Sequence, residues 1–148
     1  MFNGSTFGFV NGIITMLSLM TGMYATRVNK VGIIGAILAM IISDPLCDAY
    51  AIYIAQKENE PGATPDVAIQ AFLSQVSLQA LFLFIIIMVP QLKYGIYTSY
   101  AVGFLGTVYY SYIKSLTIQE TTKNMLGIIT LIAITYGIDN LVYKYFKK

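Results

Sequence analysis

The chain has 148 residues and a net charge of +2; 57% of its residues are hydrophobic and only 11% are charged. A soluble domain carries about 25% charged residues, so this composition excludes a surface that faces water throughout and indicates a polytopic membrane protein. One cysteine and no histidine exclude intrachain disulfides, Cys/His zinc sites and catalysis by a Ser-His or Cys-His pair.

Five apolar segments are each close to the ~20 residues that a membrane-spanning helix needs. They predict helices over residues 7–26, 31–56, 67–89, 94–116 and 125–146. The one substantial polar loop covers residues 57–66, and its Thr64, Pro65 and Asp66 are typical of a helix start. The sequence therefore predicts an all-α membrane protein with five transmembrane helices in a single domain, residues 1–148.

Small and hydroxyl side chains share one face of the first predicted helix. They are Gly4, Gly8, Asn11, Thr15, Ser18, Gly22 and Ala25. Such a face lets another backbone come close, so we expect a homodimer with a seam through Gly4, Gly8 and Gly12 that faces the second copy or the second helix. The alternative use of this face is a polar path lined by its asparagine, threonine and serine side chains.

Two acids stand in the middle of the second apolar segment, where each costs about 2.5–3.5 kcal/mol on insertion scales. Asp44 and Asp48 are four residues apart, so they share one face of a helix. Pro45 lacks an N–H and leaves the carbonyl oxygen of Ile41 free beside them. This strip of oxygens predicts a metal site with Asp44 and Asp48 as principal ligands and Asn11 as a neutral oxygen ligand. The alternative is that the acids are protonated structural groups bonded to a tyrosine or glutamine.

Polar residues of the later segments are candidates for contacts between helices. Gln75 and Gln79 are four residues apart and predict hydrogen bonds to a neighbouring helix, which would act as interhelical glue. Asp139, late in the last segment, lies near the side of the membrane that carries Arg27 and Lys30, which favours an ion pair over a transport role. Counting lysine and arginine residues on the two sides favours an amino terminus outside the cytosol.

Two stretches of the chain resemble the vacuolar iron transporter family. Residues 6–12 read TFGFVNG and residues 43–53 read SDPLCDAYAIY, which are similar to the family's motifs in its first and second helices. Asp44 and Tyr53 agree with the family pattern, whereas Asn11 replaces an aspartate, Asp48 replaces a methionine and Ile52 replaces a glutamate. The five spans match in layout along the whole chain.

The resemblance implies a homodimeric, proton-coupled exporter of Fe²⁺ or Mn²⁺ from the cytosol, with a cytosolic amino terminus, against the charge count. The family's long acidic region between the second and third helices is reduced here to Glu58, Glu60 and Asp66. Because Asp48 replaces a sulfur ligand, the oxygen donors that remain suit Mn²⁺, Mg²⁺ or Ca²⁺ at least as well as Fe²⁺.

The favoured hypothesis is therefore a divalent metal transporter in the vacuolar membrane, another endomembrane or the plasma membrane. Its partners would be the metal ion, membrane lipid and a second copy of the chain. We expect no enzyme activity, no resident cofactor and no nucleic-acid partner. Two alternatives remain: a non-transporting membrane scaffold that keeps the fold, and a proton-driven exporter of small organic cations.

Overall fold

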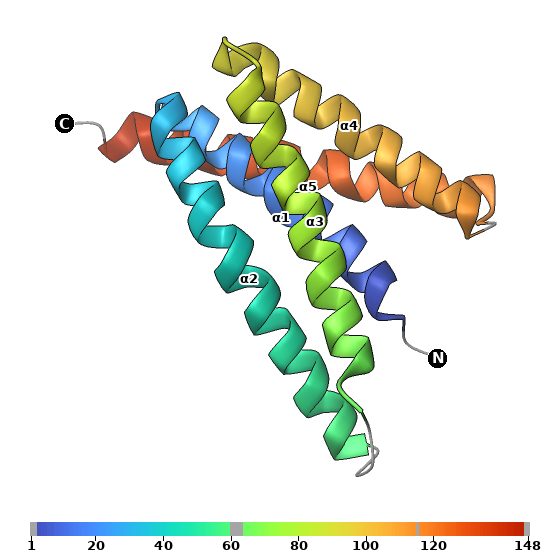
Figure 1. Cartoon of the computed structure of the whole chain (residues 1–148). Coiled ribbons are helices and arrows are strands. Elements are labelled where there is room, and N and C mark those ends of the chain that lie inside the picture. Colours follow the sequence, from blue (N-terminus) through green and yellow to red (C-terminus); the bar gives the residue numbers. More distant parts are fainter. Residues whose placement is uncertain (1–2, 60–63, 115, 147–148) are drawn as a thin grey trace.

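The computed structural model describes residues 3–59, 64–114 and 116–146, and in these ranges the chain is all-α with no strand (Figure 1). The five helices are α1 (Gly4–Ala25), α2 (Lys30–Asn59), α3 (Asp66–Met88), α4 (Leu92–Ile113) and α5 (Ile118–Phe146). The predicted helix class and order are thereby confirmed. α5 begins seven residues before the predicted start because Thr117 and Glu120 cap it reciprocally: Thr117 N–H donates to Glu120 Oε2 over 2.9 Å, and Glu120 N–H donates to Thr117 Oγ1 over 3.3 Å.

Four of these helices, α1, α2, α3 and α5, are long and apolar enough to cross a membrane. Their lengths and composition are compatible with a multi-pass membrane protein. α4 has 22 residues but does not join this group, because tyrosine, serine and threonine side chains lower its hydropathy. A fifth span therefore stays a prediction.

The face of α1 that carries Gly4, Gly8 and Gly12, called here the glycine face, packs against α3 of the same chain. A Cβ atom on Gly4 would overlap the carbonyl oxygen of Val67, and one on Gly8 would overlap the carbonyl oxygen of Ala71. Only glycine permits this approach of two backbones. The predicted seam to a second copy or to the second helix through this face is therefore wrong, and the predicted homodimer would need another surface.

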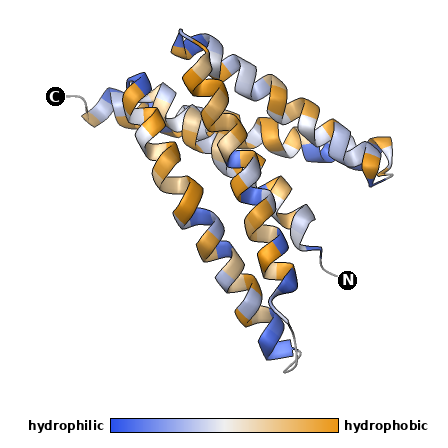
Figure 2. Ribbon diagram, in the orientation of Figure 1, coloured by the Kyte–Doolittle hydropathy of each residue, from blue (hydrophilic) through white to orange (hydrophobic). Residues whose placement is uncertain are grey.

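α2 and α3 lie side by side and run antiparallel (Figure 1). Ile37, Phe82 and Ile86 belong to the main hydrophobic core at one end of this pair. Ile52 and Ala71 belong to a second, smaller core at the other end. Hydrophilic segments interrupt both helices between these cores, as Figure 2 shows. The helix pair is thus apolar at both ends and polar in the middle.

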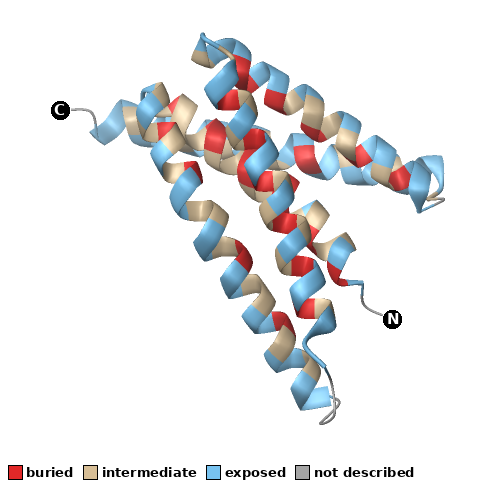
Figure 3. Cartoon of the chain, in the orientation of Figure 1, coloured by how far each residue is buried: buried red, intermediate tan, exposed pale blue. Residues whose placement is uncertain are grey.

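One face of α2 is apolar and exposed, and the two acids lie on the opposite face and point inward. The side chains of the exposed face recur every four residues and are between 39% and 68% exposed: Leu38, Ile42, Leu46, Tyr50 and Ile54. This is the surface that a helix presents to lipid. α5 is even more open (Figure 3), since Ile128 is the one buried residue among those described in it.

Candidate functional site

Five side chains from three helices form a hydrogen-bonded cluster between the two hydrophobic cores. Asn11 Nδ2 of α1 donates to Asp48 Oδ2 of α2. Gln75 Nε2 of α3 donates to both acids, over 2.7 Å to Asp44 Oδ2 and over 2.9 Å to Asp48 Oδ2. Gln79 Nε2 donates to Asp44 Oδ2 over 2.9 Å. We call these five residues the carboxylate–amide cluster.

The antiparallel arrangement of α2 and α3 explains this pairing. Asp44 and Asp48 are one helical turn apart, and so are Gln75 and Gln79. Running in opposite directions, the helices set the later glutamine against the earlier aspartate. Both pairs lie in the middle third of their helices, which is the part of a membrane-spanning helix where water is scarce.

The carboxylates accept every one of these hydrogen bonds, and the amides donate all of them. The two glutamine side chains are fully buried at 0% exposure. The other amide atoms, Gln75 Oε1 and Gln79 Oε1, are buried and have no hydrogen-bond partner among the described residues. The cluster therefore holds two acids, three amide donors and two amide oxygens whose hydrogen-bonding capacity is unused.

The Gln75 amide nitrogen bridges the two acids, since one oxygen of each lies within hydrogen-bond distance of it. A metal ion between two carboxylates takes a similar bridging position, with oxygen distances of about 2.0–2.6 Å for Mg²⁺ and Ca²⁺. In the described part of the chain, no three His, Cys, Asp or Glu side chains gather where they could hold a metal. A metal here would therefore need neutral oxygens, from amide side chains, backbone carbonyls or water, beside the two carboxylates.

The structure brings together all three predicted site residues, Asn11, Asp44 and Asp48. The hydrogen bonds that the sequence predicted for Gln75 and Gln79 are present, but they go to the acids themselves, so both glutamines are part of the site. Cys47 lies exposed, next to the site in sequence. None of the five residues of the cluster contains sulfur.

Asp139 has different surroundings at the other end of α1. Its carboxylate lies against Gly22, which it approaches so closely that a Cβ atom there would overlap it. The predicted ion pair is absent from the described residues. Arg27 instead stacks on the ring of Tyr143, 4.9 Å from its centroid, and Lys30 Nζ donates to the carbonyl oxygens of Ile87 and Val89 over 3.0 and 2.8 Å. Lys30 is used in this way because the carbonyls at the end of α3 lack helical partners.

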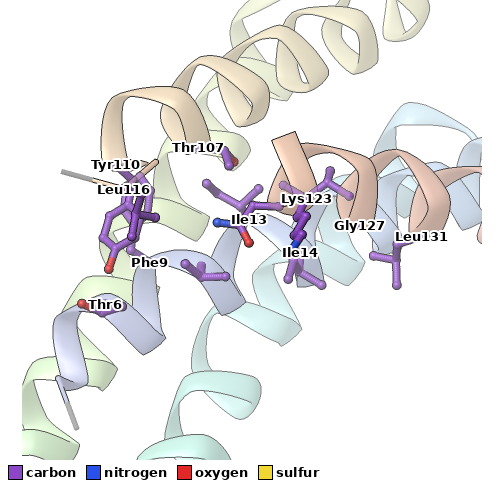
Figure 4. A pocket seen from close by; sticks show the side chains of 13 residues that line it. Thr6, Phe9, Ile13, Ile14, Thr107, Tyr110, Leu116, Lys123, Gly127 and Leu131 are labelled. Carbon is purple, nitrogen blue, oxygen red and sulfur yellow. The ribbon is translucent and has the colours of Figure 1, made fainter. Parts of the chain in front are cut away.

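A cavity of about 570 Å³ lies apart from the cluster, between α1, α4 and α5 (Figure 4). Its walls are mostly apolar, with Phe9, Ile13 and Tyr110 among them. Lys123 lines it and no acidic side chain does. The cavity is thus unsuited to a cationic ligand.

No family model matches the chain, and neither does any curated protein or solved structure. The resemblance to vacuolar iron transporters therefore stays a prediction from the two sequence stretches and the predicted layout of spans.

Proposed function

We propose that the carboxylate–amide cluster binds a divalent cation and that the chain moves this ion across a membrane. The observation that carries the proposal is the bridge by Gln75 between two acids in the middle of apolar helices. Two carboxylates at this depth are costly without a compensating charge. A divalent cation between them would supply that charge, whereas the amide N–H groups supply only partial charges.

The donor atoms support a hard cation. Carboxylate and amide oxygens suit Mn²⁺, Mg²⁺ and Ca²⁺, and they also accept Fe²⁺, whereas soft metals prefer sulfur. Fe²⁺ and Mn²⁺ are the ions that the family resemblance favours. Export from the cytosol follows from the same resemblance. Coupling to protons would follow if Asp44 and Asp48 took up protons when the metal leaves.

The main alternative is a scaffold in which the cluster only joins α1, α2 and α3. Hydrogen bonds between membrane helices contribute about 0.6–2 kcal/mol each, so four of them would hold the helices together without any ion. Export of organic cations has less support, because the cavity next to α4 and α5 carries a lysine and no acid.

Uptake of Mn²⁺ and Fe²⁺ into proteoliposomes tests the proposal. We expect flux with the natural chain and its loss in Asp44→Asn and Asp48→Asn. Asparagine keeps the shape and an acceptor oxygen but removes the charge, so both variants should melt at or above the temperature of the natural chain. Normal flux in both variants would place the site elsewhere. Loss of folding in both would favour the scaffold.

A further inference from the structure

The amide oxygens of Gln75 and Gln79 have no use in the arrangement seen here. Both side chains are fully buried, and both Oε1 atoms lack a hydrogen-bond partner in the part of the chain that is described. A buried polar atom without a partner is unfavourable. The amide nitrogens of the same two side chains make three hydrogen bonds to the acids. Each glutamine thus uses one end of its amide group and leaves the other unsatisfied.

A side-chain amide carries its oxygen and its nitrogen on the same carbon atom. Rotation about the last side-chain bond by about 180° exchanges the two, and this torsion has broad, roughly two-fold preferences. After rotation, Gln75 and Gln79 would direct their oxygens toward the carboxylates. That arrangement is repulsive when the site is empty, but it is favourable when a cation lies between the oxygens.

We propose that Gln75 and Gln79 are ligands that alternate between two orientations, and this inference rests on the proposed function. In the empty site their N–H groups stabilise the carboxylates. When a cation enters, both amides turn and coordinate it through Oε1. The loaded site then holds the two carboxylates of α2 and two neutral oxygens of α3, a donor set made only of oxygen that suits a hard divalent cation such as Mn²⁺.

This alternation makes each glutamine both a competitor and a ligand of the ion. If the glutamines served only as N–H donors, removing one would take away a competitor, and Mn²⁺ would bind as tightly as before or more tightly. If they also coordinate the ion, removing one would weaken Mn²⁺ binding. An unchanged or higher affinity would therefore exclude a role as ligand, and a lower affinity would exclude a role as competitor alone.

The experiment measures Mn²⁺ affinity of the purified full chain in detergent, from the loss of the EPR signal of free Mn²⁺. The variants are Gln75→Leu, Gln79→Leu and Gln75→Glu, and the matched control is Gln70→Leu, because Gln70 is an exposed glutamine of the same helix. Removal of groups that merely orient metal ligands already costs about 10–100-fold in affinity, so the affinity shows that the glutamines support the ion, and the infrared spectra described next show whether their oxygens bind it. We thus expect each leucine variant to bind Mn²⁺ at least about tenfold more weakly and to melt at a lower temperature without metal. Gln75→Glu, which retains the oxygen, should bind Mn²⁺ at least as tightly as the natural chain.

Infrared spectra give a readout that does not depend on the folding of a variant. In the natural chain labelled with ¹³C at the glutamine side-chain carbonyl, Mn²⁺ should shift part of the amide C=O band, and Gln70→Leu should leave that shift intact. A chain that binds Mn²⁺ without any shift, or leucine variants that bind it with unchanged or higher affinity, would overturn the alternation while leaving the proposed function in place. A natural chain that binds no Mn²⁺ would overturn both.

Discussion

Away from the first and last turns of the described helices, acidic side chains lie at two places, and their surroundings differ. Asp44 and Asp48 receive four hydrogen bonds from three amide side chains on two other helices. Asp139 lies at the crossing of α5 with α1, against the backbone of Gly22. It accepts no hydrogen bond and makes no ion pair among the described residues.

The difference indicates what the proposed site would require of partly buried acids. At Asp44 and Asp48, α3 presents donors with the same one-turn spacing through Gln75 and Gln79. Asp139 lies against Gly22, which has no side chain to donate a hydrogen bond. The acids of α2 therefore have amide partners that a cation could replace, whereas Asp139 has no hydrogen-bond partner among the described residues.

The largest effect should come from Gly8→Ala, which disrupts the contact between α1 and α3 that holds Asn11 in the cluster. The added methyl group would overlap the carbonyl oxygen of Ala71, so α1 must move away from α3. Overpacking of this kind costs about 1–3 kcal/mol or more, and the shift would also separate Asn11 from Asp48. We expect a lower melting temperature in detergent together with weaker Mn²⁺ binding.

Gly127→Ala is the matched control, because nothing lies within 4 Å of a Cβ atom at that position of α5. Alanine is favoured over glycine inside a helix by about 1 kcal/mol, so this variant should melt at the same or a slightly higher temperature. Equal destabilisation by both substitutions would contradict the packing of α1 on α3.

Replacing the acids one at a time compares the two places directly. Asp48→Asn should abolish Mn²⁺ flux into proteoliposomes because it removes half of the negative charge of the cluster. Asp139→Asn should retain most of the flux, since Asp139 is not part of that cluster. If Asp139→Asn lost as much flux as Asp48→Asn, the acid at the α1–α5 crossing would belong to the path.

A smaller effect is expected from Asn11→Ala, which removes one of the donors to Asp48. A hydrogen bond to a charged group contributes about 1.5–3 kcal/mol, although Gln75 continues to donate to the same oxygen. The variant should melt at a lower temperature and transport Mn²⁺ more slowly without losing transport. Complete loss of flux in a folded variant would make Asn11 an indispensable ligand.

The smallest effect is expected from the acids of the polar loop. Glu58 is exposed at the end of α2, Asp66 is exposed at the start of α3, and Glu60 lies outside the described residues. These three acids cannot supply a cluster of several hard ions, because each such ion requires about six oxygens. Glu58→Gln combined with Glu60→Gln should leave the flux of Mn²⁺ near normal; a near-complete loss would show that the loop gathers ions.

Much of this arrangement could be predicted from spacing along single helices. The four-residue interval placed Asp44 and Asp48 on one face, and it did the same for Gln75 and Gln79. Spacing does not indicate which helix will cover a given face, because that depends on how all the helices pack together. For this reason the glycine face of α1 was assigned to the wrong neighbour. The expected ion pair of Asp139 does not form for a related reason, because the partners of a cation also depend on how the helices pack. Arg27 stacks on a tyrosine ring, and Lys30 donates to carbonyl oxygens instead.

The most direct test of the central claim is the stoichiometry of Mn²⁺ binding to the purified chain at equilibrium. The natural chain and Asp139→Asn should each bind one Mn²⁺ per chain. The double variant Asp44→Asn/Asp48→Asn should bind none while keeping its helical content and its melting temperature. Binding of Mn²⁺ by the double variant with the same stoichiometry and affinity would show that the carboxylate–amide cluster is not the metal site.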